Sequence, residues 1–153
     1  TSGRRGGAAD FDAFNVKQPY SRGLMRPIPY GERVRFVAFE KQYGLSAQDD
    51  ALTAAAPLAF EVIDMKLGRA ALKSEHGLLT IAENGEAKFA QAMDDASASF
   101  QWIETPTGEL VLMSLRTNRF LRIDPLTRRI VADSPTPLPD NSDGTRFVWS
   151  LAK

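Results

Sequence analysis

The side chains that could carry out chemistry are few, and their types limit what they could do. The 153 residues include one histidine, His76, and no cysteine. A Ser-His-Asp triad would depend on that one histidine, a multi-histidine metal site cannot form, and disulfides and thiolate ligands are excluded. The adjacent carboxylates Asp49-Asp50 and Asp94-Asp95 would face opposite sides of a strand, which does not make an acid-base pair. We therefore expect no catalytic residues, no metal and no cofactor.

Polar and aromatic side chains at turns remain as candidates for a binding site. A tyrosine ring can stack on the apolar face of a ligand, while carboxylates, amides and guanidinium groups can bind its hydroxyls. Each candidate also has a purely structural interpretation, as a core or rim tyrosine, a turn histidine bonded to a backbone carbonyl, or a solvated hairpin tip. The candidates are Tyr43, Asp49, His76, Asn84, Asn118, Arg119 and Asp124.

The composition argues against several kinds of partner. Nineteen basic residues balance nineteen acidic ones, so no net field would draw the chain to nucleic acid or to an anionic membrane. No stretch approaches the roughly 20 apolar residues of a membrane span, and no signal peptide opens the sequence. We expect neither nucleic acid nor a membrane as a partner, and the hydrophobic content of 43% is enough for one core.

Three aromatic triplets mark an internal repeat. They are Phe60-Glu61-Val62, Phe100-Gln101-Trp102 and Phe147-Val148-Trp149, which are 40 (100 minus 60) and 47 (147 minus 100) residues apart. On a strand, the first and third residues of each triplet point to one face. The triplets define repeats of about 34–68, 69–108 and 109–152, each ending in the triplet strand.

Within each repeat the pattern predicts three further strands before the triplet. Asn84-Gly85, between the second and third strands of the middle repeat, is a strong hairpin-turn signal. The expected strands are 34–39, 43–47 and 52–54 in the first repeat, 70–74, 76–81 and 88–90 in the second, and 110–114, 119–123 and 130–132 in the third.

Four strands in three copies, joined by short turns and without a long helix pattern, predict a β-trefoil: a six-stranded barrel capped by three hairpins. We expect the Phe and Trp side chains of the triplets to fill the barrel with Leu45, Leu79 and Leu121. A β-sandwich is the alternative all-β fold, but it requires no repeat. The expected domain covers residues 30–153, and residues 1–29 form a strand and linker that follow a preceding domain.

The repeat pattern resembles that of the fascin-like and ricin-type β-trefoils. Their repeats read as N-x-(Y/F)-L, (L/V)-x-A and F-x-W, which appear here as Asn118-Arg119-Phe120-Leu121, Ile130-Val131-Ala132 and Phe147-Val148-Trp149. The match covers residues 34–152 and is degenerate in the first repeat. The resemblance implies a trefoil that binds a ligand and does not catalyse a reaction.

The segment Gly6–Val16 resembles a different family. Its sequence GGAADFDAFNV is similar to the final strand of the β-sandwich domain that follows the propeller in glycoside hydrolase family 43. The alternative is an ordinary amphipathic strand whose Phe11, Phe14 and Val16 pack on the trefoil. Lys17–Pro29 has the composition of a linker, and because the sequence begins at Thr1 we expect it to be a piece of a longer polypeptide.

Together the resemblances imply a non-catalytic carbohydrate-binding module of a bacterial, secreted or periplasmic polysaccharide-degrading enzyme. The expected partners are a polysaccharide or oligosaccharide and the neighbouring catalytic domain of the same polypeptide. The alternatives are a structural trefoil that stabilises that glycoside hydrolase domain, and a fascin-like protein-binding trefoil.

A group of arginines in the third repeat is either a solvated surface or a site for an anionic sugar or a phosphate: Arg116, Arg119, Arg122, Arg128 and Arg129.

Overall fold

The computed structural model describes residues 26–48, 51–53, 57–91, 95–138 and 142–152. The expected strand at Gly6–Val16 and most of the expected linker lie outside these residues. Backbone contacts divide the chain into two units, of which the larger contains Ile28–Ile103 and Leu110–Lys153. The larger unit carries the fold and the candidate site.

Twelve strands form one sheet in the described part of the chain. One short helix, α1 (Asp95–Ala98), lies in the connection between two of them. The strands are β2 (Arg33–Ala38), β3 (Ser46–Gln48), β4 (Ala51–Thr53), β5 (Phe60–Asp64), β6 (Arg69–Ser74), β7 (Gly77–Ile81), β8 (Ala87–Ala90), β9 (Phe100–Glu104), β10 (Leu110–Ser114), β11 (Phe120–Ile123), β12 (Ile130–Ser134) and β13 (Phe147–Leu151).

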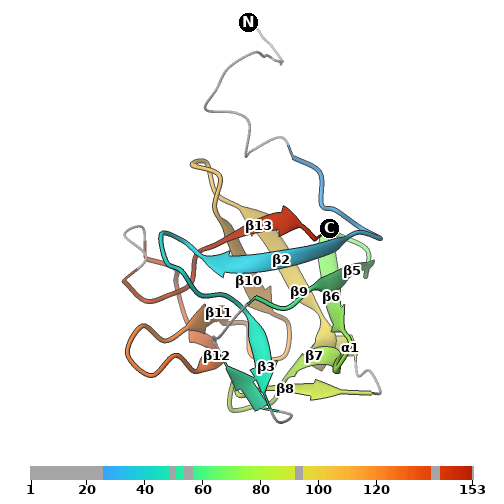
Figure 1. Ribbon diagram of the computed structural model, residues 1–153. Helices are drawn as coiled ribbons and strands as arrows, with labels where there is room; N and C mark the ends of the chain where they lie inside the picture. Colours follow the sequence, from blue (N-terminus) through green and yellow to red (C-terminus); the bar gives the residue numbers. More distant parts are fainter. Residues whose placement is uncertain (1–25, 49–50, 54–56, 92–94, 139–141, 153) are drawn as a thin grey trace, which may run out of the picture. The chain divides into compact units, whose positions relative to one another are not determined.

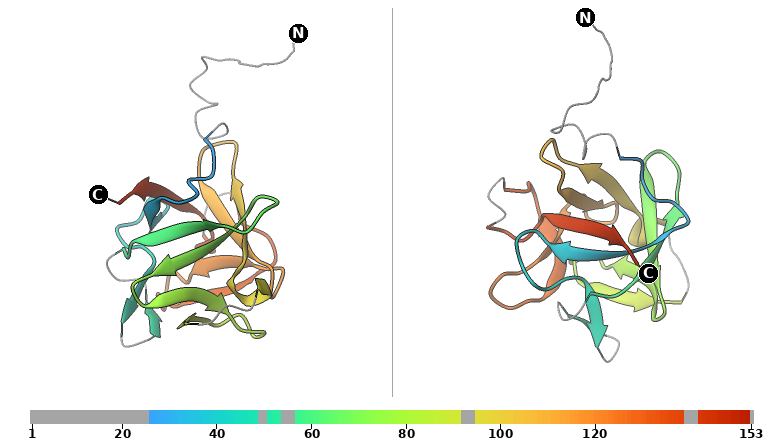
Figure 2. Two further views of the ribbon diagram at one scale, coloured as in Figure 1. Left: turned by 90° about the vertical axis from the view of Figure 1, so that its right-hand side faces the viewer. Right: turned by 45° about the horizontal axis from the view of Figure 1, so that its top comes forward.

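The first and fourth strands of the three repeats close into a barrel. Strand β2 pairs with β5, β5 with β6, β6 with β9, β9 with β10, β10 with β13, and β13 returns to β2. The second and third strands pair as the hairpins β3–β4, β7–β8 and β11–β12, which lie toward one end of the barrel in Figure 1 and in the left view of Figure 2. The fold is the predicted β-trefoil. A β-sandwich is excluded because the six barrel strands form a closed ring.

The core is formed by the side chains that the strands bury on their inner face. The triplet phenylalanines Phe60, Phe100 and Phe147 are fully buried, as predicted, and so are the leucines of the second strands: Leu45, Leu79 and Leu121. Burying a large apolar side chain stabilises the fold by about 1.5–3 kcal/mol. The three copies thus supply equivalent side chains to one core.

The two tryptophans of the triplets differ in burial. Trp102 is 7% exposed and packs edge-on against Phe36, with ring centroids 5.9 Å apart. Trp149 is only half-buried, and its ring meets the edge of Trp102 at a centroid distance of 6.0 Å. The prediction that both fill the barrel therefore holds fully for Trp102 and in part for Trp149.

Two details differ from the sequence-based expectations. Strand β3 begins at Ser46 rather than at residue 43, because the Leu45 carbonyl accepts a hydrogen bond from Leu58 N (2.7 Å) outside the hairpin ladder. Helix α1 was not expected, and with four residues it is too short for a hydrophobic period to reveal it.

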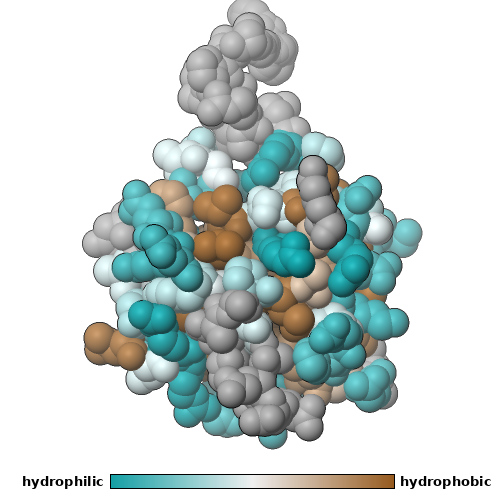
Figure 3. Space-filling view, in the orientation of Figure 1, coloured by the Kyte–Doolittle hydropathy of each residue, from teal (hydrophilic) through white to brown (hydrophobic). Residues whose placement is uncertain are grey.

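Exposed apolar side chains are scattered over the surface. On the face drawn in Figure 3, brown hydrophobic patches are separated by hydrophilic side chains. Two of the large exposed side chains, Val148 (43%) and Leu151 (50%), lie on β13. No helix among the described residues is long and apolar enough to cross a bilayer.

The smaller unit comprises residues 1–27 and Glu104–Glu109. Among its described residues, Arg26 forms an ion pair with Glu104. The hydroxyl groups of Thr105 and Thr107 both donate to Glu109 Oε1, at 3.2 and 2.8 Å, which fixes this turn.

Candidate functional site

Two of the predicted site residues occupy the same position in different repeats. Ala38 N donates to Tyr43 O in the first repeat, and Ser114 N donates to Arg119 O in the third, each at 2.9 Å. Each of these bonds spans five residues at the turn between the first and second strands. Tyr43 and Arg119 are therefore equivalent by the pseudo-threefold symmetry.

The second repeat has a shorter turn at the same place. His76 N donates to Ser74 Oγ (3.0 Å), just as Arg116 N donates to Ser114 Oγ (3.1 Å) in the third repeat. His76 is thus equivalent to Arg116, and the next residue is Gly77, with φ of 112°. The turn between the first and second strands therefore carries different side chains in each repeat.

The hairpin of one repeat contacts the third strand of the next. At the β7–β8 tip, Gly85 O accepts a hydrogen bond from Ala132 N of β12 (2.8 Å), and Glu86 bridges to Val131. Strand β4 of the first repeat pairs in the same way with β8 of the second, through Ala51 and Lys88. The β7–β8 tip therefore lies beside β12 of the following repeat.

We number the surface regions around the turns between first and second strands by their repeats. In the first, Arg128 of the β11–β12 hairpin lies over Tyr43 of the β2–β3 turn. In the second, His76 of the β6–β7 turn lies beside Phe89 of β8. In the third, the β7–β8 tip and the β10–β11 turn line one cavity, which we call the third groove. The predicted site residues divide among them, with Tyr43 in the first, His76 in the second and Asn84 and Arg119 in the third. Asp49 lies outside the described residues.

The third groove has a volume of about 660 Å³. It joins Asn84 of one repeat to Arg119 of the next, two residues that the sequence analysis selected separately. Asn118, also selected, precedes Arg119 in a left-handed conformation (φ 56°) and is exposed beside the groove without lining it. The groove is lined by Glu83, Asn84, Arg116, Thr117, Arg119, Ala132 and Asp133.

Hydrogen bonds between side chains and the backbone fix the walls of the third groove. Thr117 Oγ1 donates to Ala132 O (3.0 Å) and accepts from Arg119 N (3.2 Å), which ties the β10–β11 turn to β12. On the opposite wall, Asn84 Oδ1 accepts from Glu86 N (3.0 Å), so its amide nitrogen keeps both donors available to a ligand. The groove is therefore preformed, with polar groups on both walls.

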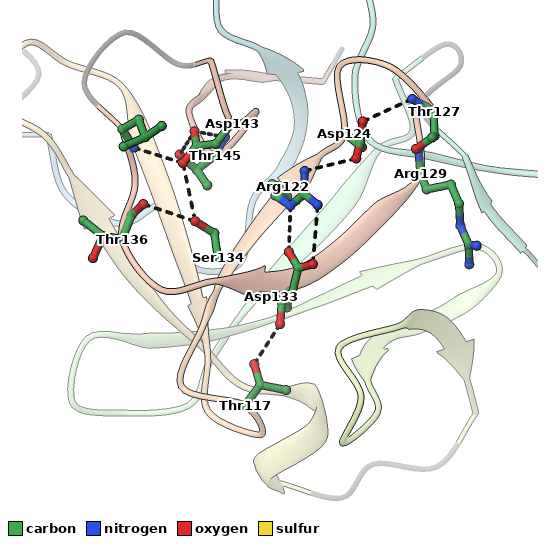
Figure 4. A network of polar contacts seen from close by, with 12 residues as sticks. Thr117, Arg122, Asp124, Thr127, Arg129, Asp133, Ser134, Thr136, Asp143 and Thr145 are labelled. Carbon is green, nitrogen blue, oxygen red and sulfur yellow. Dashed lines mark hydrogen bonds and ion pairs between the residues drawn. The ribbon is translucent and has the colours of Figure 1, made fainter.

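The carboxylate of Asp133 is held by Arg122 on the neighbouring strand (Figure 4). Arg122 Nε donates to Asp133 Oδ1 at 2.6 Å, and its Nη1 donates to Asp124 Oδ2 at 3.2 Å. The hydrogen bond to Asp133 is the main reason that the pKa of Arg122 is raised above its usual value. Asp133 is thus an oriented acceptor at the floor of the groove.

The Asp124 carboxylate stabilises the turn that begins at this residue. Its Oδ1 accepts from Leu126 N (2.8 Å) and Thr127 N (3.2 Å), and these backbone donors are the main reason that its pKa lies below the usual range. With Oδ2 bonded to Arg122, both oxygens have intramolecular partners. Among the predicted site residues, Asp124 is the one whose contacts fit a structural role best.

The long loop after β12 is tied by one carboxylate, Asp143 (Figure 4). Its Oδ2 accepts from Leu138 N (3.0 Å), and its Oδ1 accepts from Thr145 Oγ1 (2.8 Å). Ser134, the last residue of β12, donates to Thr136 O (3.1 Å) in the same network. These bonds hold the end of the strand that carries Asp133.

In the first region, an arginine from the hairpin of the third repeat covers the candidate tyrosine. The Arg128 guanidinium lies 4.0 Å from the centroid of the Tyr43 ring, the place that a stacked ligand would occupy. Arg128 itself is exposed at the β11–β12 tip, with φ of 64°. Tyr43 is therefore covered by a cation rather than presented as an open platform.

Replacing Arg128 tests this closure. We expect Arg128→Ala to uncover the Tyr43 ring and to lower the free energy of unfolding by no more than about 1 kcal/mol, since the cation–π contact is exposed. Nitration by tetranitromethane, read by peptide mass spectrometry, should rise at Tyr43 and stay constant at Tyr30, whose hydroxyl donates to Arg69 O. An unchanged nitration rate at Tyr43 would contradict the closure.

The second region, around His76, presents a different surface. The His76 ring lies beside Phe89, with ring centroids 5.8 Å apart, and its Nε2 is 3.5 Å from the Glu75 carboxylate. The His76 carbonyl accepts from Gln91 Nε2 at 3.3 Å. His76 is thus held in a turn by its backbone, with its ring partly exposed.

The sequence analysis did not select two polar lining residues of the third groove as binding candidates, Thr117 and Asp133. It also did not bring the lining residues together, because they belong to two repeats and the repeats were considered one at a time. The signal that could have found them is the threefold symmetry, which requires every hairpin tip to lie beside the next repeat. No group of three or more His, Cys, Asp or Glu residues within the described ranges could hold a metal ion.

No protein-family model and no curated protein sequence matches the chain. Solved structures do. A β-1,3-galactosidase of glycoside hydrolase family 43 has a TM-score of 0.69 and 10% identity, over 80% of this chain and 28% of that one. A GlcNAcα1-4Gal-releasing endo-β-galactosidase from Clostridium perfringens has a TM-score of 0.66 and 9% identity, over 80% of this chain and 33% of that one.

A free-standing trefoil is also similar. The β-trefoil protein BEL has a TM-score of 0.64 and 14% identity, over 84% of this chain and 98% of its own. The chain spans less than a third of the family 43 enzyme, so that likeness concerns one part of a larger protein. At these identities the likeness establishes the fold: the chain is a β-trefoil, similar in backbone to a complete trefoil protein and to portions of two glycosidases.

Proposed function

We propose that the chain is a non-catalytic carbohydrate-binding module. The observation that carries this proposal is the third groove, whose two walls hold donors and acceptors within one preformed cleft. Arg116, Arg119 and the Asn84 amide can donate, while Glu83 and Asp133 can accept. A sugar hydroxyl both donates and accepts a hydrogen bond, so a row of hydroxyls needs this mixed lining.

The proposal extends to the setting of the module. The similar portions of a β-1,3-galactosidase and of an endo-β-galactosidase support a module carried by a polysaccharide-degrading enzyme. The resemblance of Gly6–Val16 to a family 43 strand agrees with this setting. We place the enzyme in a bacterium, secreted or periplasmic, where polymers are available.

The third groove contains no aromatic side chain among its lining residues. A sugar bound there would depend on hydrogen bonds rather than on stacking. Each neutral hydrogen bond contributes about 0.5–1.5 kcal/mol net, so a few of them give a weak site. We therefore expect dissociation constants in the micromolar to millimolar range for a single oligosaccharide, by the usual relation of affinity to free energy.

Titration of the chain against a panel of plant and algal polysaccharides tests the proposal. Asn84→Ala removes the free amide donors, and we expect it to weaken binding about 3- to 10-fold, the equivalent of one hydrogen bond. Gln91→Ala is the control, because it removes an exposed amide outside the third groove. Affinity electrophoresis or calorimetry measures both, and failure to bind any saccharide would overturn the proposal.

A structural role beside a catalytic domain is the second candidate. Strand β13 favours it, because Val148 and Leu151 are exposed on either side of the half-buried Trp149. In an enzyme that carries the module, deletion of residues 30–153 separates the two functions. Loss of folding or of turnover on small soluble substrates would support scaffolding, and loss on polymers alone would support binding.

A further inference from the structure

The charges of the third groove are not equally available to a ligand. Asp133 shares both of its oxygens with Arg122, at 2.6 and 3.4 Å, so its charge is already compensated. Arg119 is exposed and its guanidinium has no hydrogen bond or ion pair with any residue that the structure describes. One wall of the groove therefore offers an uncompensated cation.

A second cation on the same wall forms an ion pair with a solvated carboxylate. Arg116 Nη2 lies 3.3 Å from Glu83 Oε2, and the Glu83 side chain is 85% exposed. Such a solvated ion pair contributes about 0–1 kcal/mol, so an incoming anion can replace the glutamate at little cost. Arg116 and Arg119 are three residues apart in the β10–β11 turn and line one cavity.

We propose that the third groove binds an acidic saccharide, whose carboxylate or sulfate group is held between Arg116 and Arg119. Guanidinium groups bind both anions through paired N–H donors, and these charge-assisted bonds are about twice as strong as neutral ones. The Asn84 amide on the opposite wall would donate to a hydroxyl of the same sugar. The inference rests on the proposed carbohydrate-binding function and specifies its ligand class.

Matched oligosaccharides test the anionic group directly. The probes are an oligogalacturonate, the same oligosaccharide after reduction of its carboxyl groups, and a sulfated galacto-oligosaccharide. We expect one or both anionic probes to bind the full chain at least about tenfold more tightly than the neutral one, since a hydrogen bond to a charged group is worth about 1.5–3 kcal/mol. Whichever anionic probe binds identifies the substituent, and its affinity should fall as salt is raised.

Variants locate the site. We expect Arg119→Gln and Arg116→Gln each to weaken the anionic probe about tenfold and to leave the neutral probe within about twofold, because each removes one charge-assisted contact. Arg33→Gln is the matched control, since it removes an exposed arginine from β2 in the barrel. The unfolding midpoint of each variant checks that the fold is intact.

The results of these experiments distinguish the proposal of an acidic ligand from the proposal of carbohydrate binding. Equal binding of the charged and neutral probes, or equal losses in Arg33→Gln and Arg119→Gln, would overturn the acidic ligand and leave carbohydrate binding standing. Failure to bind any of these probes or any member of the polysaccharide panel would overturn both.

Discussion

Replacing Phe60 by alanine should lower the free energy of unfolding by about 3–5 kcal/mol, the cost of removing a buried phenylalanine from a packed core. The Phe60 ring is fully buried at the start of β5. It packs against Phe36 at a centroid distance of 5.8 Å and stacks on Phe89 at 6.3 Å. Because domains of this size are stable by about 5–15 kcal/mol, the loss is a large part of the total.

Two variants make this prediction decisive. Phe60→Leu keeps most of the apolar volume and should cost about 1.5 kcal/mol or less, so it reports the packing even if the alanine variant does not fold. Glu61→Ala changes the exposed neighbour on the same strand and should stay within about 0.5 kcal/mol. Urea denaturation followed by tryptophan fluorescence measures all three, and a loss below about 1 kcal/mol in Phe60→Ala would contradict a shared core.

The core could be predicted from the sequence because it obeys the strand period. Phe60, Phe100 and Phe147 recur in phase, and a buried residue in one copy implies a buried residue in the others. Closure of the barrel follows from three copies of one unit. The limits of β3 could not be predicted, because they depend on the bond between Leu45 and Leu58, which no local pattern records.

The sequence predicts individual residues of the candidate site but not that they lie together, because the site joins two neighbouring repeats. Sequence reasoning found Asn84 and Arg119 because each is a polar residue at a turn. It could not join them, because Asn84 belongs to one repeat and Arg119 to the next. Their meeting depends on the backbone bond from Ala132 to Gly85 across the repeats.

The arginines of the third repeat show the same limit. The sequence groups them as one set, but their contacts separate them. Arg128 covers Tyr43 in the first region, Arg122 holds Asp133, and Arg119 lines the third groove. Core positions therefore repeat while surface positions diverge, and the three regions have three different surfaces.

Gly144 should be among the residues least tolerant of substitution. It precedes β13 with φ of 80°, and a Cβ there would lie 2.0 Å from the Ile123 carbonyl oxygen. Ile123 is fully buried at the end of β11, and its N–H donates to Gly144 O at 3.0 Å, so neither backbone can move aside freely. We expect Gly144→Ala to cost about 2–5 kcal/mol, the sum of left-handed strain and forced displacement of packed backbone.

Gly31 provides a control with the same backbone conformation. Its φ is also 80°, but an added Cβ would meet no atom within 4 Å. Gly31→Ala should therefore cost only the left-handed strain, about 1–2 kcal/mol. Denaturation of the two variants side by side separates strain from collision: equal losses would mean that the approach of residue 144 to Ile123 does not constrain the fold, whereas a larger loss at 144 assigns the difference to that contact.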